Sequence, residues 1–346
     1  MINEQLKKIL LKSDDIFSDI KGQGNAKEQL KSALLSERHI ILVGPPGVGK
    51  TTLAKNIAKL LPEMDVTKGC KYHCEPENPV CPECVQQKAA KKEIKKERIS
   101  GEKRFIRIQG SPDLTVEDLI GDIDPIKAMK FGPLSIEAFT PGKIFKANRG
   151  ILFFDELNRC PPKLQNAMLE VLEEGKVTVG SYDIDIETDF IFVGTMNLDD
   201  NTTEKLSTVF MDRFDIINIS YPETLELEAG IVSAKGNSNN AQFPKQLLDT
   251  TIGFVRSLRE SDKLSKKPSV RASLGLYERA CANAMLKNRS IVNLEDVSDA
   301  IISVLAHRIE LKPSIRYLQT PETFLKDEIK NYFDTELSSK KSGEFL

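Results

Sequence analysis

The sequence lacks several features that mark whole classes of protein. Its 346 residues contain no Trp, which excludes nothing, but no apolar run approaches the roughly 20 residues that span a bilayer. Neither sign of charge dominates, because 49 Lys and Arg stand against 51 Asp and Glu, a formal net charge of −2. Proteins that bind nucleic acid through their electrostatic field carry a basic excess, so nucleic acid is an unfavoured partner. The amphipathic, acid-bearing start has no signal-peptide core, and we expect a cytoplasmic protein without membrane insertion.

The residues that are present indicate a globular protein of two or three domains. Hydrophobic residues make up 40% of the chain and charged residues 29%, which excludes a disordered class. Four of the 6 Cys form one tight group. In a reducing compartment such a group suggests a metal before disulfides.

Short apolar runs alternate with helical patterns over the first two thirds of the chain. Residues 1–36 predict two helices, with Asn25 as a cap for the second. Helices are also predicted from Lys50 to about Leu61 and after Pro162, and residues 176–187 predict a hairpin around Gly180 and Ser181. Alternating strands and helices indicate a parallel α/β sheet. The predicted strands are residues 39–43, 104–108, 151–154, 190–195 and 215–220.

The strand signals stop after Tyr221 and Pro222, which sets the expected domain boundaries. We predict an α/β core over residues 1–222, with an insertion rich in Cys and Lys at 62–104. A helical domain without strands follows at 223–312, and residues 313–346 form a helical tail. Cys281 lies on an apolar stripe of the helical domain and is expected in its core.

A phosphate-binding loop follows the first strand. The segment matches G-x-x-x-x-G-K-[ST], with a strand before it and a helix after it. Its glycines let backbone N–H groups surround phosphate oxygens, Lys50 can reach the β- and γ-phosphates, and Thr51 can hold Mg²⁺. The alternative is a glycine-rich turn that happens to contain Lys. The nucleotide-binding residues of the loop are Gly44, Pro45, Pro46, Gly47, Val48, Gly49, Lys50, Thr51 and Thr52.

Acidic and amide side chains end two later strands. The run ILFFDE delivers Asp155 and Glu156 to the carboxyl edge, where open α/β sheets bind ligands. Asp155 would orient Mg²⁺, and Glu156 would act as general base on the attacking water. Asn197 ends the next strand and can bond that water or the γ-phosphate. Solvated acids and a turn-favouring Asn are the plainer interpretations.

Together these motifs resemble an AAA+ ATPase, within which the chain is most similar to the magnesium chelatase I-subunit and MoxR-like group. The resemblance covers about residues 16–312 and includes GDIDPIKAM, FTPGKIFKANRGILFFDELN, LEVLEEGKV, MDRFD and PSVRASLGLYERACANAML. It implies a P-loop AAA+ core with a parallel sheet, followed by an all-α lid. Segment 119–147 lies where this clade inserts a hairpin into its second helix.

The resemblance also implies roles for single residues. Arg213 matches the arginine finger that reaches the γ-phosphate of a neighbouring subunit, and Arg271 matches the sensor-2 arginine of the lid. Gln23 and Gly24 match the segment that packs near adenine. A guanidinium is the best planar partner for the charge of the phosphoryl transition state. A finger supplied in trans requires oligomers, and the resemblance implies a hexamer. The plainer alternatives are a helix cap for Arg213 and a solvated lid residue for Arg271.

The insertion at 62–104 carries the pattern C-x3-C-x6-C-x2-C. Cys70, Cys74, Cys81 and Cys84 can close one tetrahedral site for Zn²⁺ or, less favoured, an iron–sulfur cluster. His73 can replace one Cys, and redox-active or unpaired thiols are the alternative. The Lys-rich run from Lys88 to Arg104 predicts a solvated helix rather than a nucleic-acid surface.

Three function classes follow from these residues. The favoured one is a ring-forming motor that hydrolyses ATP with Mg²⁺ and remodels or activates a partner protein. By resemblance, the partner is a magnesium or cobalt chelatase subunit, or a protein with a von Willebrand A-type domain. The alternatives are a DNA-handling ATPase related to replicative helicase cores, and a metal-bearing scaffold that hydrolyses ATP slowly or not at all.

Overall fold

The computed structural model of the chain describes residues 4–12, 15–132, 135–179, 184–197 and 206–342. Contacts between Cα atoms divide the chain into two compact units. The first comprises residues 1–45 and 49–219, and the second comprises residues 46–48 and 220–346.

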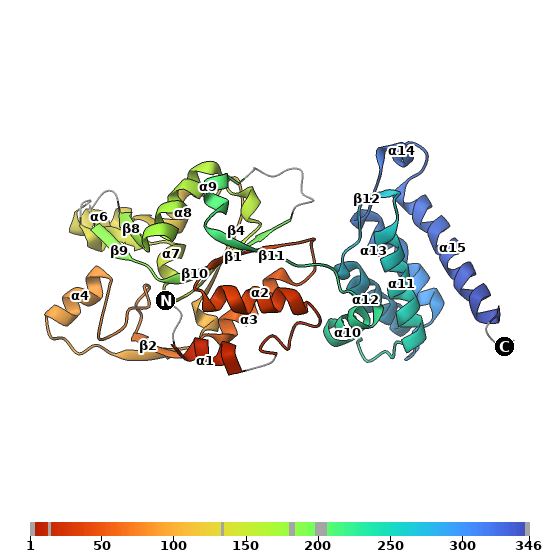
Figure 1. Cartoon of the computed structure of the whole chain (residues 1–346), viewed down its shortest axis with the longest axis horizontal. Helices are drawn as coiled ribbons and strands as arrows, with labels where there is room; N and C mark the ends of the chain where they lie inside the picture. The colour runs from red at the N-terminus through yellow and green to blue at the C-terminus, as the bar shows by residue number, and fades with distance from the viewer. Residues whose placement is uncertain (1–3, 13–14, 133–134, 180–183, 198–205, 343–346) are drawn as a thin grey trace. The chain divides into compact units, whose positions relative to one another are not determined.

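A five-stranded parallel sheet forms the centre of the first unit (Figure 1). The three inner strands are almost entirely apolar and pair with a neighbour on each side, as is typical of strands covered on both faces of a sheet. The order from edge to edge is β11, β1, β10, β7, β4, and the predicted parallel α/β sheet is thus confirmed. The strands are β1 (His39–Val43), β4 (Phe105–Gln109), β7 (Gly150–Asp155), β10 (Phe190–Met196) and β11 (Phe214–Asn218).

Helices lie on both faces of this sheet (Figure 1). On one side are α2 (Gly24–Leu35) and α3 (Lys50–Leu60), and on the other are α8 (Pro162–Glu174) and α9 (Thr208–Met211). The apolar side chains of α8 repeat at i, i+4 and i+7, which places them on one face of the helix. These side chains, Leu164, Met168 and Val171, are buried in one core cluster with residues of β1, β7 and β10.

The start of the chain contains two helices, as predicted. They are α1 (Glu4–Lys12) and α2, which begins at Gly24. Gln23 is the residue before α2, in the left-handed region at φ 62°, and no side chain caps the helix. The prediction that Asn25 caps α2 is wrong, because Asn25 already lies inside the helical first turn.

The insertion at 62–104 is a two-stranded ribbon with one helix between its strands. Strand β2 (Met64–Thr67) pairs antiparallel with β3 (Lys96–Ile99), and α4 (Pro82–Ala89) lies between them in sequence. The predicted helix over the Lys-rich run is wrong. The helix ends at Ala89, and the later part of the run enters β3 at Lys96, where pairing with β2 overrides helix propensity. The predicted exposure is confirmed for Lys91, Lys92, Lys95 and Lys96, but Arg104 at the end of the run is buried.

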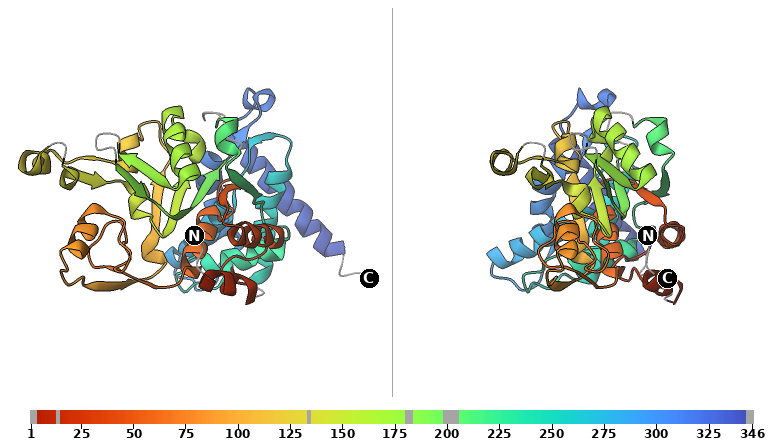
Figure 2. Two further views of the ribbon diagram at one scale, coloured as in Figure 1. Left: turned by 60° about the vertical axis from the view of Figure 1, so that its left-hand side comes forward. Right: turned by 90° about the vertical axis from the view of Figure 1, so that its left-hand side faces the viewer.

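A second insertion projects from the first unit as a hairpin with a helix at its tip (Figure 2). Strand β5 (Gly121–Ile123) pairs antiparallel with β6 (Phe139–Pro141), and α6 (Pro125–Phe131) lies between them.

Strand β8 (Lys176–Val179) pairs antiparallel with β9 (Ile184–Glu187), as the hairpin prediction requires. Gly180 and Ser181 lie outside the described residues. The other short helices of the first unit are α5 (Val116–Ile120), α7 (Lys143–Lys146), η1 (Glu102–Arg104), η2 (Ile136–Ala138) and η3 (Leu157–Arg159).

The second unit is helical, with one short ribbon that the sequence did not predict. Strand β12 (Leu264–Lys266) pairs antiparallel with β13 (Glu310–Leu311). Cys281 is fully buried in the core of this unit, as expected. The tail contributes Phe324 and Leu325 to the same core. The helices are α10 (Leu225–Lys235), α11 (Lys245–Glu260), α12 (Val270–Leu286), α13 (Leu294–Leu305), η4 (Ala306–Arg308), α14 (Pro313–Arg316) and α15 (Pro321–Ser342).

Candidate nucleotide-binding site

Two positions of the phosphate-binding loop require glycine. A Cβ on Gly44 would lie 2.1 Å from the carbonyl oxygen of Ile219, so no side chain fits there. Gly49 has a φ of 100° and is the residue before α3, a conformation that L residues with a Cβ rarely adopt. The loop therefore turns sharply out of β1 and directly into the N-terminus of α3, where backbone N–H groups attract anions.

The Lys50 ammonium lies inside this turn. It donates hydrogen bonds to the carbonyl oxygens of Gly44, at 2.5 Å, and Pro45, at 2.9 Å. Lys50 is the first residue of α3, followed by Thr51 and Thr52 in the same turn. A cation held within a curl of backbone is suited to an entering phosphate, because it can exchange carbonyl oxygens for phosphate oxygens.

The acidic and amide residues share an edge of the sheet with this loop. Strand β10 pairs in parallel with β1 through Val43 and Met196, and with β7 through Gly194 and Phe154. The carboxyl ends of these three neighbouring strands therefore meet, and the loop, Asp155 and Asn197 follow directly from them.

Asp155 has a partner for each carboxylate oxygen. Its Oδ1 accepts a hydrogen bond from Thr195 Oγ1 at 2.7 Å, and its Oδ2 lies 2.6 Å from Arg107 Nη2. Thr195 and Arg107 thus fix the orientation of the Asp155 carboxylate at the end of β7. Sequence reasoning missed Arg107 and Thr195. The exposed Arg107 and Gln109, alternating with apolar residues of β4, were the available signal.

Glu156 is held by both its backbone and its side chain. Its φ is 57°, in the left-handed region, and its N–H donates to Thr195 Oγ1 at 2.9 Å. Its Oε2 accepts a hydrogen bond from Gln109 Nε2 at 3.0 Å and lies 3.2 Å from Arg159 Nη1. The Thr195 hydroxyl thus connects to both acidic residues, fixing the turn that carries them.

Asn197 directly follows β10, and Asn158 Nδ2 donates to its carbonyl oxygen at 3.3 Å. Arg213 directly precedes β11. Its Nη2 lies 3.0 Å from Glu173 Oε2 on α8, and its Nε is buried without a hydrogen-bond partner among the described residues. Gln23 and Gly24 are at the start of α2. Arg271 belongs to the second unit, where it is exposed in the first turn of α12, so its approach to a nucleotide stays a prediction.

Comparisons with known proteins identify the class of this site. Sequence models of three families match separate segments: "Magnesium chelatase, subunit ChlI" at residues 16–75, "ATPase family associated with various cellular activities (AAA)" at 86–216, and "AAA lid domain" at 258–328. Over these three segments the chain resembles the AAA+ ATPases. Within them it resembles the magnesium-chelatase I subunit.

Named relatives agree over most of their length. The magnesium-chelatase subunit ChlI homologue of Methanocaldococcus jannaschii is 25% identical and covers 86% of each chain. The chloroplastic magnesium-chelatase subunit ChlI-2 of Arabidopsis thaliana is 29% identical, covering 86% of this chain and 76% of that protein. A solved complex of the magnesium-chelatase subunits BchI and BchD contains a similar chain, with 20% identity, a TM-score of 0.49 and coverage of 87% and 98%.

The first unit also brings its four clustered cysteines together. The sulfur atoms of Cys70, Cys74, Cys81 and Cys84 all lie within 4.8 Å of one another. His73 is directed elsewhere, with Nδ1 3.3 Å from the carbonyl oxygen of Asn148. Cys160 is buried apart from the group, and burial raises the pKa of its thiol to about 12.

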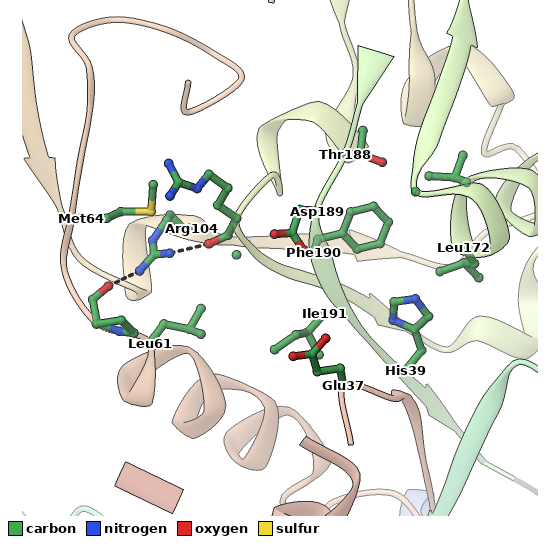
Figure 3. A pocket seen from close by; sticks show the side chains of 15 residues that line it. Glu37, His39, Leu61, Met64, Arg104, Leu172, Thr188, Asp189, Phe190 and Ile191 are labelled. Carbon is green, nitrogen blue, oxygen red and sulfur yellow. Dashed lines mark hydrogen bonds between the residues drawn. The ribbon is translucent and has the colours of Figure 1, made fainter. Parts of the chain in front are cut away.

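A separate cavity of about 480 Å³ opens at the other edge of the sheet, where the strands begin (Figure 3). The Arg104 guanidinium crosses it to the carbonyl oxygens of Pro62 and Arg149. His39 Nδ1 accepts a hydrogen bond from the N–H of Phe192 at 3.2 Å. Burial, with the charge of Arg38 as a smaller cause, lowers the pKa of His39 to about 4. This cavity is distinct from the phosphate-binding loop.

Among the described helices of this chain, none has the length and apolar character needed to cross a membrane.

Proposed function

We propose that the chain binds ATP with Mg²⁺ and hydrolyses it within a ring of its own copies, and that this cycle remodels or activates a partner protein. The observation that carries the proposal is the strand register. It aligns the loop holding Lys50 with Asp155, Glu156 and Asn197 at one edge of the sheet.

Each residue has a distinct task in this proposal. Lys50 and the loop backbone bind the β- and γ-phosphates, while Thr51 and Asp155 hold Mg²⁺, which neutralises charge on the phosphate oxygens. Glu156 accepts a proton from the attacking water, and Asn197 orients that water or the γ-phosphate. Asp155 is suited to its task because Thr195 and Arg107 each hold one of its carboxylate oxygens in place.

Assembly completes the site. Arg213 would cross to the γ-phosphate of an adjacent copy, and Arg271 would read the phosphates from the lid. Gln23 and Gly24 would lie near the adenine. By resemblance to other AAA+ proteins, the ring is hexameric. A guanidinium supplied to a phosphoryl transition state raises turnover by about 10³ to 10⁵ in other nucleotide hydrolases, so an unassembled chain should be nearly inactive.

The helix α6 supports a protein partner. Ile126 and Met129 are 80% and 91% exposed at the tip of the β5–β6 hairpin, and exposed apolar side chains that lie together mark interaction sites. The relatives are named as subunits of magnesium chelatase, an enzyme of several chains. A chelatase-type subunit, or a MoxR-type client with a von Willebrand A-type domain, is therefore the proposed partner.

Phosphate release from ATP tests the hydrolysis directly. Wild type should turn over ATP with Mg²⁺, and Glu156→Gln should lose turnover while still binding nucleotide. Glu170→Gln is the matched control, because Glu170 is an exposed carboxylate on α8 away from the strand ends. Turnover that survives in Glu156→Gln, or is absent from an assembled wild type, contradicts the proposal.

Capture on immobilised Glu156→Gln with ATP tests the partner. A candidate chelatase or von Willebrand A-type subunit should bind with ATP, and Met129→Ser should weaken that binding at unchanged basal turnover. Leu286→Ser removes an equally exposed apolar side chain, 82% exposed on α12, and should have no effect. Strong stimulation of turnover by duplex DNA, without such capture, would instead favour the DNA-handling alternative.

A further inference from the structure

The geometry points to a tetrahedral Zn²⁺ site formed by Cys70, Cys74, Cys81 and Cys84, which serves as the core of the insertion between β2 and β3. The insertion, orange in Figure 1 around α4, is in turn fastened to the sheet through Asn148. This inference is independent of ATP hydrolysis.

The spacing of the sulfur atoms fits a single ion. Four sulfurs at about 2.3 Å from one Zn²⁺ stand about 3.8 Å apart in a tetrahedron. The Sγ atoms of Cys70 and Cys81 are 3.8 Å apart, and all four sulfurs lie within 4.8 Å of one another. An iron–sulfur cluster distributes its cysteines over several iron ions, so some of its sulfurs must be more widely separated than this.

Backbone N–H groups are directed at the sulfurs. Cys74 Sγ accepts from the N–H of Val80 at 3.4 Å and of Cys81 at 3.3 Å, and Cys81 Sγ accepts from the N–H of Cys84 at 3.4 Å. A neutral thiol is a weak acceptor, whereas a thiolate is the metal ligand and gains from such donors. These bonds orient the ligands as outer-shell partners do in metal sites.

Apart from this group, the insertion buries few apolar side chains, among them Val66 and Ile99 of its ribbon. Its local cluster consists of three buried cysteines, packed with Cys70, Tyr72 and Val80. Segments of this size rarely hold together by apolar burial alone and commonly depend on a metal or on disulfides. All six cysteines of the chain are free thiols in this structure. Of the two means of holding such a segment together, a metal is therefore the one that remains.

Asn148 joins the cysteine group to the sheet. Its Nδ2 donates to the carbonyl oxygen of Tyr72 at 2.8 Å, and its Oδ1 accepts from the N–H of Asp189 at 2.9 Å, directly before β10. Its own carbonyl oxygen is 3.3 Å from His73 Nδ1. The Asn148 side chain is buried, so these contacts are shielded from water. The site therefore holds the insertion in one position against the amino ends of β7 and β10.

Elemental analysis of the purified full chain tests the metal. We expect one Zn per chain in wild type and in Cys160→Ser, and at least a fivefold loss in Cys70→Ser. Cys70 is the ligand with the greatest exposure of the four, so its replacement is the mildest. Cys160→Ser is the matched control because Cys160 is a buried thiol outside the group. Replacement of Zn²⁺ by Co²⁺ in wild type should give the absorption of a tetrahedral thiolate complex.

Several results would overturn the site. They are a wild type without bound metal and with four titratable thiols, a visible iron–sulfur spectrum, a disulfide within the group, or equal Zn content in Cys70→Ser. The fastening role is tested by amide hydrogen exchange. In Asn148→Ala, exchange in residues 64–99 should accelerate at unchanged Zn content, while exchange in α12 stays the same. Unchanged exchange in residues 64–99 would contradict it.

Discussion

Arg213 and Glu173 form an ion pair within one chain, with Nη2 and Oε2 3.0 Å apart. The residue proposed to act on a neighbouring copy is therefore held by its own subunit. Assembly must replace this pair with the phosphate of the adjacent site. The pair is about one third exposed at Arg213 and more at Glu173, so its strength is about 0–1 kcal/mol. The finger is thus restrained weakly enough for nucleotide to release it.

Glu173→Gln should release Arg213 from its ion pair before the subunits assemble. We expect turnover at chain concentrations below saturation to rise up to about fivefold, the equivalent of about 1 kcal/mol, with little change once the ring is saturated. Glu170→Gln, one turn away on the same helix, is the control. A concentration dependence identical to that of wild type would contradict a role for the pair.

Thr195→Val removes the hydroxyl of Thr195 and keeps the size of the side chain, so it tests whether the hydroxyl positions the two acidic residues. Thr195 is 1% exposed, and its hydroxyl contacts Asp155 Oδ1 and the Glu156 N–H. Removing such an outer-shell contact typically costs 10- to 100-fold in activity or metal affinity, so we expect turnover to fall by about that factor and the Mg²⁺ requirement to rise. Thr195→Ser keeps the hydroxyl and should restore most turnover. Equal turnover in Thr195→Val and wild type would show that the hydroxyl is not needed.

Glu228→Gln should destabilise the second unit strongly. Glu228 is fully buried and bidentate with Arg259, with both N–O distances at 2.6 Å. Breaking one side of such a pair costs about 3–5 kcal/mol, measured as the free energy of unfolding in urea. Asp19→Asn breaks the exposed pair with Lys59 and should have little effect on the free energy of unfolding, because water screens exposed pairs. Similar losses in the two variants would contradict the importance of the buried pair.

The same pair predicts acid sensitivity of the second unit. Burial alone would raise the pKa of Glu228, but the hydrogen bonds and charge of Arg259 lower it below its ordinary value of 4.5. The unfolded chain then binds more protons, so the contribution is present above pH 4.5 and is lost as pH falls through the lower folded pKa. Glu228→Gln should remove this part of the pH dependence of unfolding.

His39 predicts a second pH effect in the first unit. Its pKa falls from 6.5 to about 4 on folding, so the unfolded state binds more protons between these values. Stability should decline by about 3 kcal/mol as pH falls from 7 to 4 on account of this group. In His39→Asn, whose Oδ1 can still accept the Phe192 N–H, the decline should be smaller by that amount. An unchanged pH profile in this variant would refute the assignment.

Local pattern and motif spacing were sufficient to predict the sheet strands and the loop around Lys50. The partners of the acidic residues were not predictable in this way. Arg107 and Gln109 are on β4, more than 40 residues before Asp155, and come beside it only because β4 pairs with β7. Glu173 reaches Arg213 for a similar reason, because α8 packs against α9 and Arg213 follows α9 in the chain. Sheet order and helix packing decide these contacts, and the local periodicity of the sequence predicts neither of them.

In the insertion between β2 and β3, the sequence predicted one feature, the cysteine group, and failed to predict another, the strand β3. The cysteine spacing predicted a common site, and the four sulfurs do lie together. The Lys-rich run predicted a helix from composition, but residues 96–99 pair with β2 instead. Strand pairing depends on a partner segment that local propensity does not include.

The most direct test of the central claim is ATP turnover in a mixture of two inactive variants. Arg213→Ala keeps Glu156 but lacks the finger, while Glu156→Gln keeps the finger but lacks the base. If the finger acts on a neighbouring copy, mixed assemblies contain intact sites, and turnover should reappear on mixing at a sizeable fraction of the wild-type rate. If each variant is inactive alone and the mixture stays inactive although the two chains co-assemble, or if Arg213→Ala alone retains full turnover, the account is contradicted.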